Sequence, residues 1–113
     1  MQTDFQFQVG QLVQHVRYGY RGVVAARDDR CEATEAWYRS NATTPERGQA
    51  WYHVLVHGER HTTYVAQENL ESDGGGEQVV HPLTKSLFEY FQRGCYQPRN
   101  DVRFPSWPRD DEA

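Results

Sequence analysis

Features that would assign this chain to a membrane or secreted class are missing. No stretch approaches the roughly 18 consecutive apolar residues of a membrane-spanning helix, and the first residues lack the basic and apolar regions of a signal peptide. The two cysteines, Cys31 and Cys95, lie far apart and form no CxxC motif. This pattern favours reduced thiols in a cytoplasmic protein, with a single long-range disulfide as the alternative.

Sequence signatures of catalysis are also missing. The chain has no Gly-x-Ser-x-Gly elbow, no phosphate-binding P-loop and no dinucleotide fingerprint, and the glycines at 74–76 lack a strand-to-helix context. No pair of carboxylates is placed for acid–base chemistry. We therefore expect a protein that is not an enzyme and that holds no cofactor.

Positive charge is in short supply, because 12 Lys and Arg face 16 Asp and Glu for a net charge of -4. This balance argues against a uniformly basic, nucleic-acid-binding surface. Basic and aromatic residues do interleave locally, at Arg17, Tyr18, Tyr20, Arg21, Arg27 and Arg30. Such residues can contact phosphates and stack on bases. Alternatively, the tyrosines belong to the core or a turn, and the arginines only keep the surface soluble.

What the sequence does contain is a pattern of short strands. With 37% apolar and 13% aromatic residues, 113 residues suffice for one domain with a small core in which large rings fill the space. Strands are expected at 11–16 and 23–26, and again at 51–57 and 62–65, before a helical turn at 66–70. The predicted core consists of Leu12, Val23, Tyr52, Val54, Val56, Tyr64, Val65 and Leu70.

The remaining segments connect or follow these hairpins. A short helix is expected within 31–39, an acidic, glycine-rich and mobile linker at 71–78, and an edge strand at 79–83. The apolar stripe Leu83, Leu87, Phe88 and Phe91 predicts a helix at 84–93 that Gly94 ends. The fold class is therefore mainly β, a small SH3-like antiparallel barrel with an inserted helix and a C-terminal helix. The domain covers 1–96, and 97–113 forms a Pro-rich, acidic, irregular tail.

The histidines are the only candidates for a metal site. His53 and His57 fall on one predicted strand face, and His57 and His61 flank the turn that follows. They are either metal ligands or polar residues on a solvated face. No Cys or carboxylate completes a ligand set at a suitable spacing, so we expect no metal. His15 and His81 are isolated in the sequence.

Three blocks of the chain resemble a known family. They are 7–15 running into Tyr18-Gly19-Tyr20-Arg21-Gly22-Val23-Val24, then Trp51-Tyr52-His53-Val54-Leu55-Val56, then 63–70. With His81-Pro82-Leu83 they resemble, over residues 5–96, the YccV-like or hemimethylated DNA-binding domains, also called the heat shock protein HspQ family. The stretch 31–37 is more similar to the variant of this domain found in larger proteins, including some F-box proteins.

The resemblance implies an SH3-like barrel and a binding function without catalysis. It implies hemimethylated DNA as the partner. The interleaved basic and aromatic residues are then the candidate DNA-binding residues, namely Arg17, Tyr18, Tyr20, Arg21, Arg27 and Arg30. The alternative is an adaptor or specificity factor that delivers substrates to an ATP-dependent protease of the Lon or Clp type. That role predicts an exposed aromatic patch for a protein partner at Trp37, Tyr38 and Trp51. The DNA sequence, the protease and the oligomeric state stay open.

Overall fold

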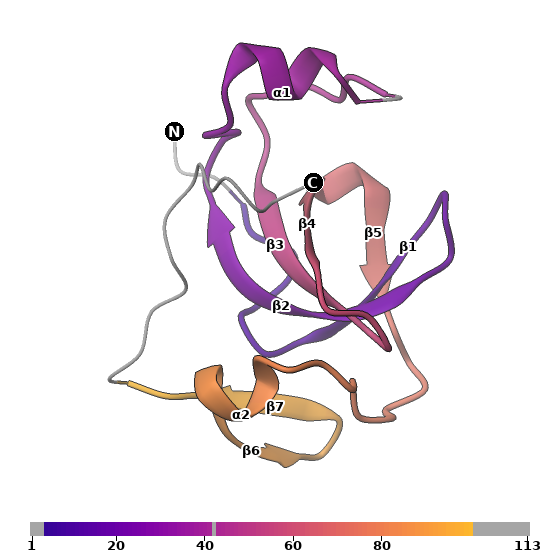
Figure 1. The fold of residues 1–113 in the computed structure, drawn as a ribbon, viewed down its shortest axis with the longest axis vertical. Coiled ribbons are helices and arrows are strands. Elements are labelled where there is room, and N and C mark those ends of the chain that lie inside the picture. The colour runs from indigo at the N-terminus through magenta and orange to yellow at the C-terminus, as the bar shows by residue number, and fades with distance from the viewer. Residues whose placement is uncertain (1–3, 42, 101–113) are drawn as a thin grey trace.

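The computed structural model describes residues 4–41 and 43–100. Its elements, in chain order, are β1 (Leu12–His15), β2 (Arg21–Asp28), α1 (Glu35–Arg39), β3 (Trp51–Val56), β4 (Thr62–Ala66), the 3-10 turn η1 (Gln67–Asn69), β5 (Leu70–Ser72), α2 (Thr84–Leu87), β6 (Phe88–Gln92) and β7 (Cys95–Pro98) (Figure 1). The described chain is mainly β, as the sequence predicts. None of its helices has the length and apolar character to cross a membrane.

Five of the strands form one curved antiparallel sheet in the order β4-β3-β2-β1-β5. Leu12 lies opposite Val23 where β1 pairs with β2, and Val13 lies opposite Ser72 where β1 pairs with β5. A register shift between Val24 and Ala26 lets the long strand β2 bend along its pairing with β3. The edge strands β4 and β5 form no strand pair with each other in the described residues, so the sheet does not close.

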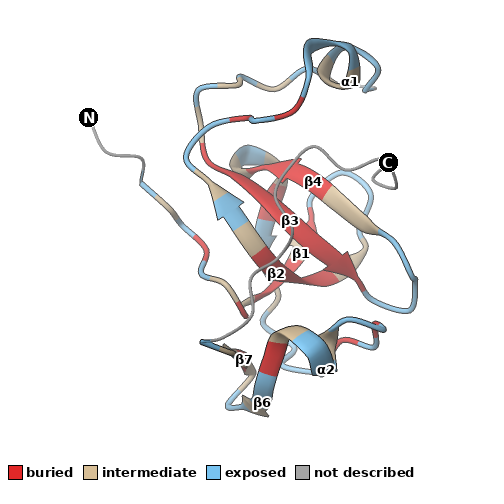
Figure 2. Cartoon of the chain, turned by 60° about the vertical axis from the view of Figure 1, so that its left-hand side comes forward, coloured by how far each residue is buried: buried red, intermediate tan, exposed pale blue. Residues whose placement is uncertain are grey.

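Apolar side chains cover both faces of this sheet. All eight residues of the predicted core are buried. One cluster joins Val13, Val24 and Tyr52 to Phe7 of the N-terminal segment. One of the two interpretations of His53, a polar residue on a solvated face, is wrong, since β3 is buried along its whole length (Figure 2). Segments far away in the sequence cover that face.

The expected helix at 84–93 is wrong. The helix α2 is a single turn, and β6 and β7 form a hairpin instead. Arg93 and Gly94 link the two strands with φ angles of 53° and 74°, the positive values that a two-residue type I′ turn requires. Apolar residues that repeat at a helical spacing therefore lie partly on β6, where the hairpin turn decides the conformation.

The hairpin β6–β7 packs on the sheet through Tyr96. Phe88 and Tyr96 belong to one buried cluster with Leu55 of β3. The backbone N–H of Tyr96 donates to the carbonyl of Gly10 at 2.8 Å, and its hydroxyl lies 3.2 Å from the nitrogen of Val79 and 3.1 Å from its oxygen. The segment 79–83 forms coil and turn without a strand, so the edge strand expected there is wrong.

The expected linker at 71–78 is partly structured. Glu71 and Ser72 belong to β5, and the Asp73 carboxylate accepts a hydrogen bond from Arg21 at 2.5 Å. The mobility of this segment stays a prediction. At the C-terminal end β7 extends to Pro98, beyond the predicted domain boundary at residue 96. Residues 101–113 of the expected tail lie outside the described residues.

Candidate binding site

A pocket of about 160 Å³ lies between the β1–β2 loop, the inserted segment with α1, and β4. Five aromatic rings line it together with small and polar side chains; the residues are His15, Tyr18, Tyr20, Trp37, Asn41, Thr43, Pro45, Trp51, Thr63, Tyr64, Val65, Ala66 and Asn69. No Lys, Arg, Asp or Glu is among them. The pocket joins two of the tyrosines predicted for DNA to two of the tryptophans predicted for a protein partner.

His15 fixes the loop that forms one wall of the pocket. The backbone N–H groups of Arg17 and Tyr18 both donate to its Nδ1, at 3.1 Å each. Burial, with a smaller effect of the nearby Arg17 charge, lowers the pKa of His15 below its ordinary value of 6.5. The neutral ring therefore carries its proton on Nε2, because Nδ1 accepts both bonds.

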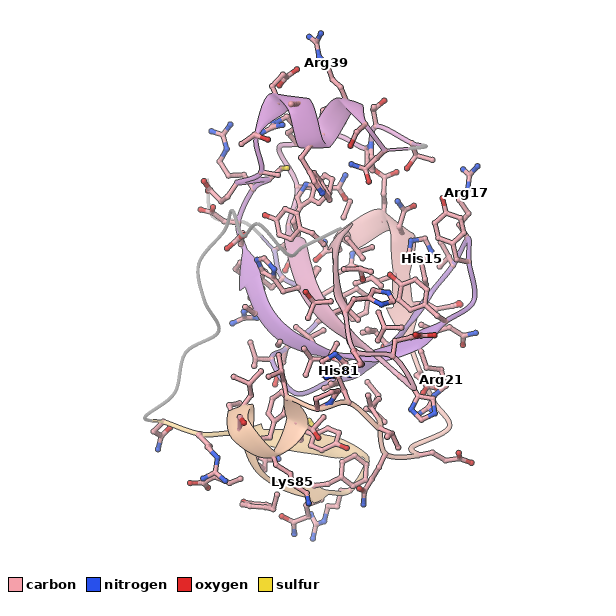
Figure 3. The ribbon with its side chains drawn as sticks, in the orientation of Figure 1. His15, Arg17, Arg21, Arg39, His81 and Lys85 are labelled. Carbon is pink, nitrogen blue, oxygen red and sulfur yellow. The ribbon has the colours of Figure 1, made fainter. Side chains whose placement is uncertain are left out.

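Two tyrosines of the loop lie against this imidazole. The ring centroids of Tyr18 and Tyr20 lie 4.7 Å and 5.2 Å from that of His15. The Tyr20 hydroxyl is 2.7 Å from the Thr63 hydroxyl on β4, which connects the loop to the sheet edge. Tyr18 stays 60% exposed, and the Arg17 guanidinium lies 5.7 Å from its ring centre. The loop thus exposes the Tyr18 ring to solvent. Arg17 points outward at the tip of the same loop (Figure 3).

The floor of the pocket is a stack of rings. Trp51 and Tyr64 lie with their centroids 5.3 Å apart, and Trp37 of α1 meets Tyr64 edge-on at 5.6 Å. The Tyr64 hydroxyl donates to the Asp28 carboxylate at 2.6 Å. Burial and this bond raise the pKa of Tyr64, so the hydroxyl stays protonated.

The Asp28 carboxylate is the charged group beneath this floor. Burial alone would raise its pKa, but the nearby His53 imidazole and the hydrogen bond from Tyr64 outweigh burial and hold the pKa below its ordinary value of 3.8. The His53 Nε2 lies 3.6 Å from the carboxylate. His53 is therefore part of the support for Tyr64, and its burial takes it away from the solvated row that the sequence suggested.

The inserted segment is held over β3 by Arg47. This guanidinium donates to the carbonyls of Cys31 and Ala33, at 3.3 Å and 2.6 Å, and lies 4.9 Å from the ring centre of Tyr38. The Tyr38 hydroxyl contacts the carbonyl oxygens of Thr44 and Pro45. Tyr38 thus shapes the loop that borders the pocket, without lining the pocket itself.

The short helix expected within 31–39 is present as α1 (Glu35–Arg39). It begins at Glu35, after Thr34 caps its N-terminus by accepting from the Trp37 N–H at 3.2 Å. Cys31 is buried ahead of the helix, and Cys31 and Cys95 are both free thiols.

The four arginines of the sequence prediction point to different places. Arg17 stands at the loop tip, whereas Arg21 donates to Asp73 and to the Glu77 carbonyl near the start of β2. Arg27 lies 4.3 Å from the ring centre of Phe5 and donates to the Phe7 carbonyl. Arg30 is exposed beyond the end of β2 and does not line the pocket. The structure therefore brings Arg17 to the pocket rim and disperses the other three.

The sequence does not predict His15 or Tyr64 as site residues, because His15 is isolated along the chain and Tyr64 is expected only in the core. Both line the pocket. The sequence does contain one signal for His15, its position two and three residues before Arg17 and Tyr18. A histidine at that spacing can accept hydrogen bonds from the backbone N–H groups of the turn that follows it. For metals, the described residues hold no group of three or more His, Cys, Asp and Glu that could bind an ion.

Comparison with known proteins identifies the relatives of this chain. Residues 5–95 match the YccV-like family, described as "Hemimethylated DNA-binding protein YccV like". The chain is also 32% identical over 107 residues to the F-box only protein 21 of Homo sapiens, Mus musculus and Pongo abelii. Each alignment covers 90% of this chain and 17% of the relative, so the chain spans about a sixth of those proteins. The chain therefore belongs to the YccV-like family.

Proposed function

We propose that this protein is a non-catalytic binding module whose ligand surface is the β1–β2 loop and the pocket behind it. The observation that supports this most is the placement of Arg17 and the 60%-exposed Tyr18 at the rim of an uncharged aromatic pocket. Ligand pockets are lined mainly by apolar and aromatic side chains with a few polar groups, and this pocket has that kind of lining. The neutral His15 beneath them keeps the loop in place without a ligand.

Hemimethylated DNA is the first candidate ligand. The description of the family supports this candidate. The tip of the loop offers two contacts suited to DNA, one for a phosphate and one for a methyl group. Arg17 would meet a phosphate, which sets affinity and salt dependence. Tyr18 and the rings behind it would supply the apolar contact that a methyl group on one strand needs.

A protein ligand is the second candidate. The module would then act as an adaptor that delivers substrates to an ATP-dependent protease. This candidate is favoured by the engagement of Arg21 and Arg27 in contacts within the chain and by the net charge of -4. A pocket without basic residues also suits a peptide better than a phosphate backbone. Binding of this kind would depend little on salt.

The fold class is also a proposal. We propose an SH3-like barrel, since the strand order β4-β3-β2-β1-β5 with a 3-10 turn before β5 returns the chain to the far edge of the sheet. The pocket then lies at one rim of the barrel, next to η1 through Asn69.

Fluorescence anisotropy with three labelled duplexes tests the DNA proposal. Hemimethylated, fully methylated and unmethylated duplexes of one sequence are titrated at several salt concentrations. The hemimethylated duplex should bind tightest, and Arg17→Ala should weaken its binding and lower the salt slope by about one unit. Lys85→Ala, which removes a positive charge at the opposite end of the molecule, should leave the slope unchanged (Figure 3).

The same titration decides between the two ligands. If the three duplexes bind alike, or Arg17→Ala leaves the salt slope unaltered, the DNA proposal is wrong and the protein ligand takes its place. Arg21→Ala is not a suitable probe of phosphate contact, because Arg21 holds Asp73 and its loss would alter the fold around β5.

A further inference from the structure

The pocket has room for one small ring. Its volume is about 160 Å³. An engineered apolar protein cavity of about 150 Å³ holds one benzene molecule. A single six-membered ring and its substituents therefore fill the pocket, whereas a duplex or an ordered peptide can only lie across its mouth.

The lining selects an uncharged ring with polar edges. The described pocket residues include no carboxylate to pair with a cation and no Lys or Arg to pair with an anion. Trp51 and Tyr64 form a stacked floor, and Tyr18 and Trp37 supply further rings at the sides. Aromatic side chains that bind bases do so by stacking on their faces.

Polar groups are available for the edge of such a ring. His15 is 6% exposed, and both backbone bonds that it accepts end on Nδ1, so Nε2 carries the proton. No described residue forms a hydrogen bond with that Nε2, which leaves it as a donor for a ligand. Asn69 adds an amide with both donor and acceptor groups. A nucleobase has this combination of flat apolar faces and a hydrogen-bonding edge.

We propose that the pocket receives a single nucleobase that has left the stack of the bound duplex. Arg17 at the rim then lies where the backbone of that nucleotide enters, and the rings of the pocket hold the base. This inference rests on the DNA-binding function proposed above and adds the group that the pocket recognises. Taking a base out of a duplex costs unstacking and unpairing, and the cost is smallest where the base is mismatched.

A mismatch experiment tests this inference. Two labelled duplexes of the same hemimethylated sequence are compared by anisotropy at one salt concentration, one fully paired and one with a central T·T mismatch. The mismatched duplex should bind roughly tenfold more tightly, because its base is already unpaired. Tyr18→Ala and Trp37→Ala should each remove this preference.

The matched control is Tyr90→Ala, since Tyr90 on β6 is 52% exposed and lies away from the pocket. It should retain the preference, and thermal melting of each variant confirms that the domain is folded. Equal affinity for the two duplexes, with binding that still requires Arg17, would show that DNA binds but no base enters the pocket. A preference that survives both Tyr18→Ala and Trp37→Ala would also overturn the inference. If neither duplex binds, the DNA proposal itself is overturned.

Discussion

Two buried histidines show how single residues set the loops of this protein. His15 accepts from two backbone N–H groups through Nδ1, and His81 accepts from the Leu83 N–H at 3.1 Å while its Nε2 lies 3.0 Å from the His61 carbonyl. Both rings are neutral in this arrangement, because a proton on Nδ1 would break the bonds that Nδ1 accepts. Burial lowers the pKa of both below 6.5.

These lowered pKa values predict an acid-sensitive fold. The unfolded chain takes up protons at His15 and His81 at a higher pH than the folded chain does. These two groups therefore leave the free energy of unfolding unchanged above about pH 6.5 and lower it as the pH falls below that value. Urea unfolding between about pH 7.5 and pH 5 measures this. His15→Asn keeps an acceptor for the loop N–H groups but does not titrate, so it should reduce the decrease. An unchanged pH dependence in this variant would contradict the role given to His15.

Among the glycines of the described residues, Gly10 has the least room for a side chain. It has a φ of 95°, and an added Cβ would lie 2.0 Å from the Tyr96 carbonyl oxygen. Gly10→Ala should therefore lower the free energy of unfolding by about 2 kcal/mol or more and loosen the contact between β7 and the sheet. Gly19→Ala is the control, since Gly19 has a φ of 76° with nothing within 4 Å and should cost only about 1 kcal/mol. Equal losses in thermal melts of the two variants would show that the contact with Tyr96 does not matter.

At the scale of elements, the sequence predicts the strands of the sheet better than the segments that pack on its faces. Alternating and β-branched residues in 51–57 and 62–65 predict the hairpin that β3 and β4 form, and the eight predicted core residues are buried. The sequence does not reveal that α1 and the β6–β7 hairpin cover the second face of β3, because those contacts join segments far apart along the chain. The apolar stripe in 84–93 fits a helix and a hairpin almost equally well. The two-residue turn at Arg93 and Gly94 decides for the hairpin.

That turn gives a prediction that separates the two structures. Asn favours the positive φ that residue 93 adopts in a type I′ turn, so Arg93→Asn should raise the free energy of unfolding by about 0.5 kcal/mol. Gly94→Ala should lower it by about 1 kcal/mol. Backbone chemical shifts provide the direct check, because they should report extended residues at Phe88–Gln92. Helical shifts across 84–93 would contradict the hairpin.

At the scale of the whole molecule, the candidate site is assembled from segments that the sequence keeps apart. Tyr18 and Tyr20 come from the β1–β2 loop, Trp37 from the insertion and Tyr64 from β4, and the curved sheet brings them to one pocket. The arginines show the reverse case, since β2 spans roughly 25 Å at about 3.3 Å a residue and carries Arg21 and Arg27 to different surroundings. Residues close together in the sequence therefore predict a basic cluster that the fold disperses. The aromatic cluster is missed because its residues lie far apart in the sequence.

Nuclear magnetic resonance of the labelled chain during titration with the hemimethylated duplex tests the central claim most directly. The amide signals of Arg17, Tyr18 and Tyr20, the indole signal of Trp37 and the amides around Thr63 should shift together, since they surround one pocket. Signals of Phe88–Gln92 and Cys95–Pro98 should stay in place, because β6 and β7 lie at the other end of the molecule. Shifts confined to β6 and β7, or none anywhere with the duplex in excess, would contradict the account.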